Sequence, residues 1–295
     1  MKKILFLFSF LFALNLSAQQ ELKWLKIKKY KVATLSDSLK ETSGLTFFRD
    51  KLYTINDGGN SSEIFEIDKK SGKILNKIKI PVENKDWEAI TTDEEDLYVA
   101  DFGNNYGNRK DLKIYRISLD SLNVNPKITS EINFFYQGQD DFTSKPHRHN
   151  FDAEALVYNG YNLSIFTKEW VSSNVTKYFA SSSLREDETQ EVQKINQYKI
   201  GYLVTDASYY LGKLYLIGYS KKMEGYLTVF PNNGDFSQKP QKYYLGSTSS
   251  LGQVEGIAVN ADGIFISAEA FNLKIFQAKQ ALYFIPWEKF EKAKK

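Results

Sequence analysis

The fold is decided by a repeated motif whose clearest copy reads Glu88-Ala89-Ile90-Thr91-Thr92-Asp93-Glu94-Glu95-Asp96-Leu97-Tyr98-Val99-Ala100-Asp101. An acidic residue opens a short apolar segment, a polar turn follows, and a stronger strand of the form Leu-Tyr-x-x comes next. Apolar runs on both sides of a turn are typical of two adjacent antiparallel strands. The motif therefore predicts a β-hairpin with a carboxylate at the start of its first strand.

The same pattern occurs five times at intervals of roughly 50 residues, a period that suits a repeated four-stranded sheet with variable loops. The openings start at Glu41, Glu88, Glu154, Asp206 and Glu255, and the second strands span residues 51–57, 96–101, 162–168, 213–219 and 263–269. Third segments with alternating apolar residues follow at 64–67, 114–117, 176–180, 227–230 and 281–285. Fourth segments follow in four copies, at 74–80, 132–136, 192–200 and 242–245.

The fifth copy lacks a fourth strand, whereas a strand-like segment at residues 24–35 precedes the first copy. We therefore predict an all-β fold, a β-propeller of five four-stranded blades in which the N-terminal strand closes the last blade. A sixth blade would fit if the long interval between Glu88 and Glu154 held a short extra one. A two-sheet sandwich explains the repeats less well.

Residues 1–18 have the form of a secretory signal peptide: two lysines, an apolar run, and the small residue Ala18 at the expected cleavage site. An uncleaved anchor is the alternative, although the apolar run is short for a bilayer. We expect a single propeller domain at 19–295, in a secreted or periplasmic location, with no integral membrane segment after cleavage.

The chain has 39 Lys and Arg against 36 Asp and Glu, and two of the basic residues are Lys2 and Lys3 of the signal. The remainder is close to neutral, so neither nucleic acid nor an anionic membrane is expected as a partner. The chain has no Cys, which excludes a cysteine nucleophile and soft thiolate ligands.

Propeller topology brings polar residues of all five repeats together. The first strand lines the channel and the second runs antiparallel to it, so the start of one and the end of the other lie on one face. Eight carboxylates are predicted there, together with Lys168 and Tyr219. They are Glu41, Glu88, Glu154, Asp206 and Glu255 from the first strands, and Asp57, Asp101 and Glu269 from the second.

So many like charges require raised pKa values, basic partners or a bound cation. Clustered carboxylates are hard oxygen ligands, so calcium is the expected cofactor and the eight acids are its candidate ligands. The alternative for the five opening acids is structural, with each carboxylate accepting backbone N–H bonds from neighbouring blades. The second-strand acids fit that alternative less well, because a loop begins at each of them.

Three further features surround the predicted ring. The loops after Asp57 and Asp101 both read Asp-x-Gly-Asn, and the second continues into a cationic stretch with Arg109; turn chemistry alone also explains the glycines and asparagines. His147 and His149 could bind a transition metal or supply a general base, or form an ordinary polar loop. Lys168 would neutralise neighbouring acids or hold an anion.

The opening motifs resemble those of secreted bacterial β-propellers of the phytase-like, esterase-like kind and, more loosely, gluconolactonase-type propellers. The runs that carry the likeness are Glu41-Thr42-Ser43-Gly44-Leu45, Asn56-Asp57-Gly58-Gly59, Asp86-Trp87-Glu88-Ala89-Ile90, Phe151-Asp152-Ala153-Glu154-Ala155-Leu156 and Val254-Glu255-Gly256-Ile257-Ala258. Such relatives include calcium-dependent hydrolases with a channel metal, which implies Glu41, Glu88, Glu154 and Glu255 as channel-lining residues. Two departures are that the ring is mostly carboxylate and that the basic phosphate cluster of a phytase is not evident.

Two classes of function follow. The first is a binding or interaction propeller with an acidic, calcium-occupied channel mouth, whose ligand (a small molecule, a glycan or a protein) the sequence does not identify. The second is a metal-dependent hydrolase of phosphate esters, lactones or similar esters, in which Asp57 or His149 would be the base and Lys168 or Arg109 would hold the leaving anion. The sequence contains no Gly-x-Ser-x-Gly elbow, P-loop or dinucleotide fingerprint. Binding is therefore favoured.

Overall fold

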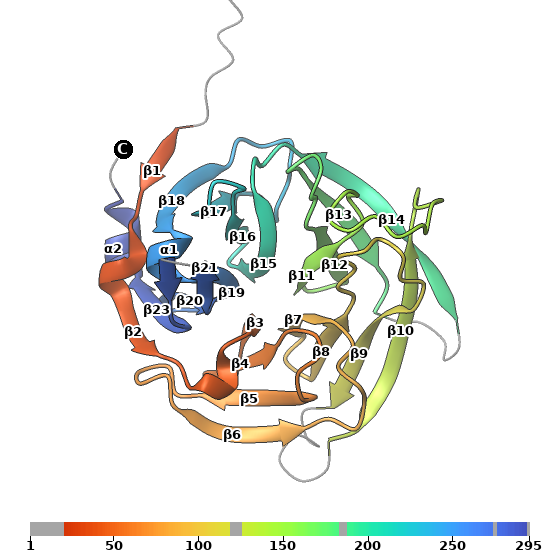
Figure 1. Cartoon of the computed structure of the whole chain (residues 1–295), viewed down its shortest axis with the longest axis horizontal. Coiled ribbons are helices and arrows are strands. Elements are labelled where there is room, and N and C mark those ends of the chain that lie inside the picture. Colours follow the sequence, from red (N-terminus) through yellow and green to blue (C-terminus); the bar gives the residue numbers. More distant parts are fainter. Residues whose placement is uncertain (1–20, 119–125, 183–187, 274–275, 294–295) are drawn as a thin grey trace, which may run out of the picture.

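The computed structural model describes residues 21–118, 126–182, 188–273 and 276–293, so the predicted signal peptide lies outside the described residues. The protein is an all-β propeller whose sheets are arranged as a ring around a central channel (Figure 1). This confirms the predicted fold class. Helical elements are short: η1 (Ile27–Tyr30), η2 (Asp37–Leu39), α1 (Thr248–Leu251) and α2 (Trp287–Glu291).

Strand pairing forms five four-stranded antiparallel units around the ring. The first is β3 (Thr42–Phe48), β4 (Lys51–Asn56), β5 (Glu63–Ile67) and β6 (Ile74–Lys79). The second is β7 (Trp87–Thr92), β8 (Asp96–Asp101), β9 (Leu112–Ser118) and β10 (Ile128–Tyr136). The third is β11 (Ala153–Tyr158), β12 (Leu163–Thr167), β13 (Val175–Ala180) and β14 (Thr189–Tyr198). The fourth is β15 (Leu203–Tyr210), β16 (Lys213–Tyr219), β17 (Glu224–Phe230) and β18 (Gln241–Ser247). The fifth is β19 (Gln253–Val259), β20 (Gly263–Glu269), β23 (Ala281–Pro286) and β2 (Lys31–Thr34).

The ring closes through the N-terminal part of the chain. Strand β2 pairs antiparallel with β23 and so supplies the outer strand of the fifth unit, as the sequence predicts. Strand β1 (Leu22–Trp24) instead adds in parallel to β18 of the fourth unit, so the N-terminal segment spans two units. A second parallel pairing, between β10 and β14, joins the outer edges of units two and three. These pairings cover strand edges that would otherwise be open to other chains.

The hydrophobic core is divided into five clusters, each of which lies between two neighbouring units. The cluster between the fifth and first units, for example, packs Phe265 and Leu282 against Leu52 and Phe65. Closure of the ring therefore buries apolar side chains at the last interface just as at the other four. Burial of this kind contributes about 25 cal/mol for each Å² removed from water.

A β-bulge recurs at the start of every first strand. The unpaired extra residue is Glu88 in β7, Glu154 in β11 and Glu255 in β19. In β3 it is Gly44 and in β15 it is Thr205. Bulges re-aim a side chain and are common beside functional sites. The structure thus aligns the three glutamates with Gly44 and Thr205, whereas the sequence comparison aligned them with Glu41 and Asp206.

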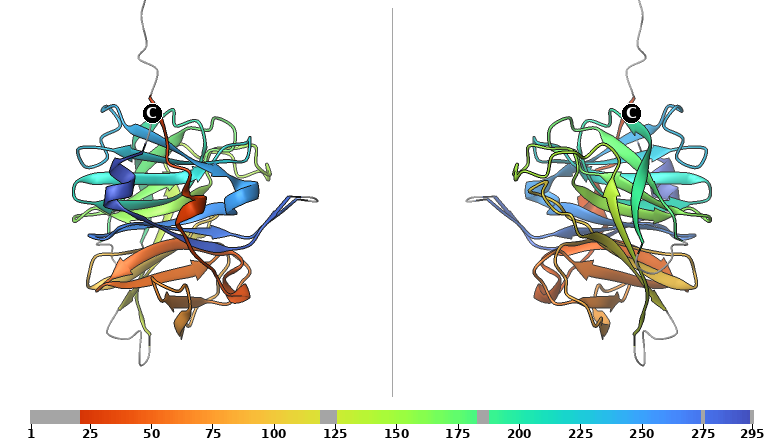
Figure 2. Two further views of the ribbon diagram at one scale, coloured as in Figure 1. Left: turned by 90° about the vertical axis from the view of Figure 1, so that its left-hand side faces the viewer. Right: turned by 90° about the vertical axis from the view of Figure 1, so that its right-hand side faces the viewer.

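One element departs from the ring. The hairpin of β21 (Phe271–Leu273) and β22 (Phe276–Ala278) projects from the body of the propeller (Figure 2). Over the described ranges, no helix has both the length and the apolar character needed to cross a membrane.

Candidate functional site

The starts of the first strands and the ends of the second strands meet at one end of the channel. Residues of all five units line a cavity of about 190 Å³ there, which we call the channel mouth. Five of the eight predicted carboxylates line it: Asp57, Glu88, Glu154, Glu255 and Glu269. Lys168 and Tyr219 line it as well, together with Trp170, Gln253, Asn105 and Ser43.

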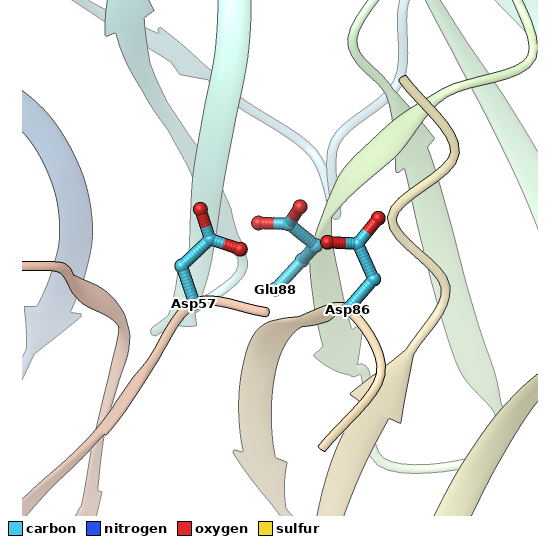
Figure 3. A group of neighbouring side chains, drawn as sticks. All are labelled: Asp57, Asp86 and Glu88. Carbon is cyan, nitrogen blue, oxygen red and sulfur yellow. The ribbon is translucent and has the colours of Figure 1, made fainter. Parts of the chain in front are cut away.

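Three carboxylates lie together at one side of the channel mouth without an ion-pair partner among the described residues; Asp57 and Glu88 line the cavity, and Asp86 lies beside them. Asp57, Asp86 and Glu88 turn toward one another (Figure 3), and one oxygen of each lies within 4.8 Å of the others. Glu88 is only 3% exposed. Its backbone carbonyl accepts a hydrogen bond from Ser43 Oγ at 2.8 Å, but within the described ranges its carboxylate has neither a hydrogen-bond donor nor an ion-pair partner. We call these three residues the carboxylate triad.

The two Asp-x-Gly-Asn loops make room for the carboxylate triad. A Cβ atom on Gly103 would overlap the carboxylate oxygens of Asp86 and Glu88, and a Cβ atom on Gly58 would overlap the Asp86 carboxylate. Only glycine permits so close an approach of backbone to carboxylate. These glycines therefore serve the carboxylate cluster as well as the turns.

The electrostatics of the triad follow from its burial. Burial, reinforced by the charges of Asp57 and Asp152, raises the pKa of Asp86 to about 7. Burial and the neighbouring Asp57 carboxylate also raise the pKa of Glu88 well above its ordinary value. The pKa of Asp57 is raised by burial too, although the backbone N–H of Gly58 opposes the shift. Burial and mutual repulsion therefore disfavour the charged forms of all three carboxylates, whereas the charge of Lys168 opposes this shift at Asp57 and Glu88.

The opposite side of the channel mouth contains its own cation. Lys168 forms an ion pair with Glu154, and both side chains are about 95% buried. The ammonium also lies 5.0 Å from the ring centre of Trp170 and 5.4 Å from that of Tyr219. Burial is the largest single influence on Lys168 and opposes its charged form, but Glu154, Tyr219, Glu255 and Asp152 together outweigh it and hold the lysine pKa above its ordinary value.

A third group comes from the fifth unit. Gln253 Nε2 donates a hydrogen bond to the carboxylate of Glu269 and a longer one, at 3.4 Å, to Glu255. Burial and the Asp57 charge raise the pKa of Glu269 to about 8, and burial raises that of Glu255 well above its ordinary value. A single neutral amide thus bridges two carboxylates.

Three predicted ring residues lie elsewhere. Asp206 accepts backbone N–H bonds from Ile257 at 2.7 Å and Leu45 at 3.2 Å. It joins the inner strands of three units, which is the structural role given above as the alternative. Because Asp206 follows the bulge residue of β15 by one position, its side chain points to the other side of the strand. Glu41 precedes β3 and is half-buried, with Lys40 Nζ 3.6 Å and Asn60 Nδ2 2.7 Å from its carboxylate.

Asp101 does not line the channel mouth but holds the backbone next to the carboxylate triad. Its carboxylate pairs with Arg109 at 2.8 Å and accepts the backbone N–H groups of Lys85 and Asp86, each at 3.3 Å. Arg109 also donates to Gly103 O at 2.9 Å and to Asp111 at 3.1 Å. Asp101 and Arg109 therefore hold the backbone that presents Asp86.

The histidines are engaged in structural contacts. His149 Nδ1 accepts the backbone N–H of Phe151 at 3.1 Å, and its Nε2 lies 3.2 Å from Asn105 O. Both ring nitrogens therefore have partners. His147 packs its ring on Trp170, with ring centres 4.1 Å apart.

The sequence analysis missed Asp86 and Trp170. A signal for the aspartate existed, because two openings read Asp-x-Glu: Asp86-Trp87-Glu88 and Asp152-Ala153-Glu154. The two aspartates differ in their environment. Asp152 accepts Trp170 Nε1 at 2.7 Å and Asn104 N at 2.6 Å, whereas Asp86 is directed at the triad (Figure 3).

Neither a family model nor a curated protein matches this chain. Among solved structures, the glutaminyl cyclase of Myxococcus xanthus is similar with a TM-score of 0.49 and 12% identity, over 87% of this chain and 94% of that one. The Cps50 (Swd1) β-propeller domain of Myceliophteria thermophila is similar with a TM-score of 0.39 and 8% identity, over 83% and 96%. No statement about the chemistry of this chain follows from either.

Proposed function

We propose that this protein is an exported binding propeller whose channel mouth binds a divalent cation, calcium, through Asp57, Asp86 and Glu88. The observation that carries the proposal is the carboxylate of Glu88, which is buried, aimed at the other two acids and without a donor in the described structure. An uncompensated buried carboxylate is costly, and a cation removes that cost.

The ligand set favours calcium over softer ions. The triad offers only carboxylate oxygens, which suit a hard cation, and the two histidines have other partners. Calcium accepts six to eight oxygen ligands in flexible geometry, and the cavity of about 190 Å³ leaves space for water molecules in the remaining positions. Kinship with phytase-like or gluconolactonase-type propellers is not needed for this proposal.

Binding is favoured over ester hydrolysis by what the candidate catalytic groups contact. A histidine that acts as a general base needs a ring nitrogen free to accept a proton, but both ring nitrogens of His149 have partners. Lys168 and Arg109 are each paired with buried acids and are not free to hold a leaving anion. Asp57 alone among the four candidates belongs to the triad, where it would be a cation ligand.

The proposal is tested by thermal unfolding of residues 19–295 in EDTA and then with calcium, magnesium or zinc. An ion that binds only the folded state stabilises it by about 2.7 kcal/mol when its concentration is about 100 times Kd. We expect a calcium-dependent rise in Tm for the wild type and none for Glu88→Gln. Glu66→Gln, which changes a buried acid paired with Lys51 in β5, is the matched control and keeps the response. No response of the wild type to any ion contradicts the proposal.

A further inference from the structure

A second and larger cavity lies at the other end of the channel. Its volume is about 730 Å³, and it is lined by the C-terminal ends of the five first strands and the turns that follow them. Its inner wall is apolar, with Leu45, Ile90 and Val259, whereas the turns carry polar residues. We call it the funnel. It shares no lining residue with the channel mouth.

Aromatic rings continue from the funnel across the surface. Tyr210 and Ala261 line both the funnel and an adjoining groove of about 820 Å³ between the fourth and fifth units. Tyr210 stacks on Trp287 of that groove, with ring centres 6.0 Å apart and planes at 18°. In the neighbouring third unit, Tyr158 of the funnel stacks on Tyr98, with ring centres 6.4 Å apart. A ligand of several linked units could therefore contact one ring after another.

Two aromatic side chains of the funnel and groove, Trp287 and Tyr209, use their polar ends within the protein. Trp287 Nε1 donates to Asn260 O at 3.1 Å, and Tyr209 OH donates to Asn233 Oδ1 at 2.5 Å. Proline-rich peptides are bound in aromatic-lined grooves, where an indole N–H free to meet a peptide carbonyl would be expected. Here the indole N–H is not free, and what a ligand can contact is the part of the half-buried Trp287 ring that is not packed on Tyr210, Tyr215 and Phe290. Ring faces are the surfaces against which the C–H groups of a pyranose pack.

The charges on the funnel rim restrict the ligand further. Asp50 and Asp262 share one ammonium, that of Lys69, at 2.6 and 3.0 Å. Both carboxylates are more than half exposed and keep further acceptor atoms for hydroxyl groups. Asp93 and Glu94 add two more acids, and Arg49 is the one basic residue that lines the funnel, whereas the adjoining groove carries Lys213, Lys239 and Glu291. An acidic rim disfavours anionic ligands.

We propose that the funnel and its adjoining groove bind an oligosaccharide of neutral or amino sugars. The rings of Tyr210 and Trp287 support successive sugar units, and the rim carboxylates accept hydrogen bonds from hydroxyl or ammonium groups. This site is independent of the channel mouth and of its cation.

The test applies residues 19–295, in EDTA, to a printed array of neutral, amino-sugar and acidic oligosaccharides, followed by calorimetry on the best ligand. We expect binding to neutral or amino sugars, reduced by about tenfold in Tyr210→Ala, because an aromatic contact is worth about 1 kcal/mol or more. Tyr161→Ala removes a tyrosine that is 83% exposed and lines neither cavity, and it should leave affinity unchanged.

A second measurement covers the case in which Tyr210→Ala does not fold. Trp287→Phe keeps an aromatic ring in the groove and removes its indole, so the ligand-induced change in tryptophan fluorescence must vanish while binding persists. The proposal is overturned if no oligosaccharide binds, if only acidic ones bind, or if a proline-rich decapeptide binds in the groove and sugars do not.

Discussion

The two sides of the channel mouth each contain a buried glutamate, but the charged groups around the two glutamates differ. Glu154 is buried and forms an ion pair with Lys168, although burial still raises the pKa of Glu154 well above its ordinary value. Glu88 occupies the equivalent bulge position in the neighbouring unit, is equally buried, and faces Asp57 and Asp86, with no ion-pair partner among the described residues. This difference in pairing is the basis of our proposal that a cation from outside binds beside Glu88.

The largest expected effect comes from removing the ion pair between Lys168 and Glu154. Lys168→Met removes the ammonium and leaves Glu154 buried without its partner, which should lower the free energy of unfolding by about 3–5 kcal/mol. Urea denaturation measures this loss. Lys113→Met, which removes an exposed partner of Glu131, is the control and should cost less than about 1 kcal/mol. Equal small losses in both variants would contradict internal compensation.

The next effect concerns how the carboxylate triad makes the free energy of unfolding depend on pH. The folded-state pKa of Asp86 (about 7) lies above that of the unfolded chain. The stability that this proton contributes is complete below the unfolded value and is lost as pH rises through the folded one. In EDTA we expect a loss on the order of 2 kcal/mol between about pH 4 and about pH 7, discounted for solvent screening. Saturating calcium should abolish most of it, because the ion replaces the proton.

The free energy of unfolding can be measured by circular dichroism across that pH range, once with EDTA and once with calcium. A stability that rises with pH in EDTA would show that the carboxylates are already compensated and would contradict the comparison.

A smaller effect is expected from the loops. Gly103→Ala places a Cβ atom against the carboxylates of Asp86 and Glu88 and should weaken calcium binding by about tenfold, or about 1.4 kcal/mol. Gly225→Ala is the control, because a Cβ atom there meets only ordinary contacts of 3.5 Å or more and should leave the affinity unchanged. Calorimetric titration with calcium distinguishes them, and equal affinities in the two variants would rule out a role for Gly103 in the triad.

The smallest effect is predicted for Glu41, an acid that the sequence placed in the ring. Glu41→Gln should change stability by less than about 0.5 kcal/mol and leave calcium binding intact, because its side chain is only half-buried and outside the channel mouth. The same titration checks this. A loss of calcium binding in this variant would mean that the ligand set extends to Glu41.

The repeats made the fold predictable. Opening acids, turns and Leu-Tyr strands recur with enough regularity to indicate a propeller, and the missing fourth strand of the last repeat indicated closure by the N-terminal segment. The parallel addition of β1 to β18 was not predictable, because three residues carry no period that specifies a partner.

The site was predictable only in part. Short motifs aligned Glu41 and Asp206 with Glu88, but the β-bulges set the true register, and a shift of one residue turns a side chain to the other face. Asp86 reaches the triad because the Asp101 carboxylate holds its backbone and because glycines lie opposite it. The residue spacing within a single repeat does not reveal contacts between loops of different repeats.

The central claim is that the carboxylate triad is a cation site, and the most direct test is anomalous diffraction from crystals grown with calcium. The account predicts a peak about 2.3–2.6 Å from carboxylate oxygens of Asp57, Asp86 and Glu88, absent from crystals of Glu88→Gln. A channel mouth without a peak at saturating calcium, or a peak only beside Glu255 and Glu269, would contradict it.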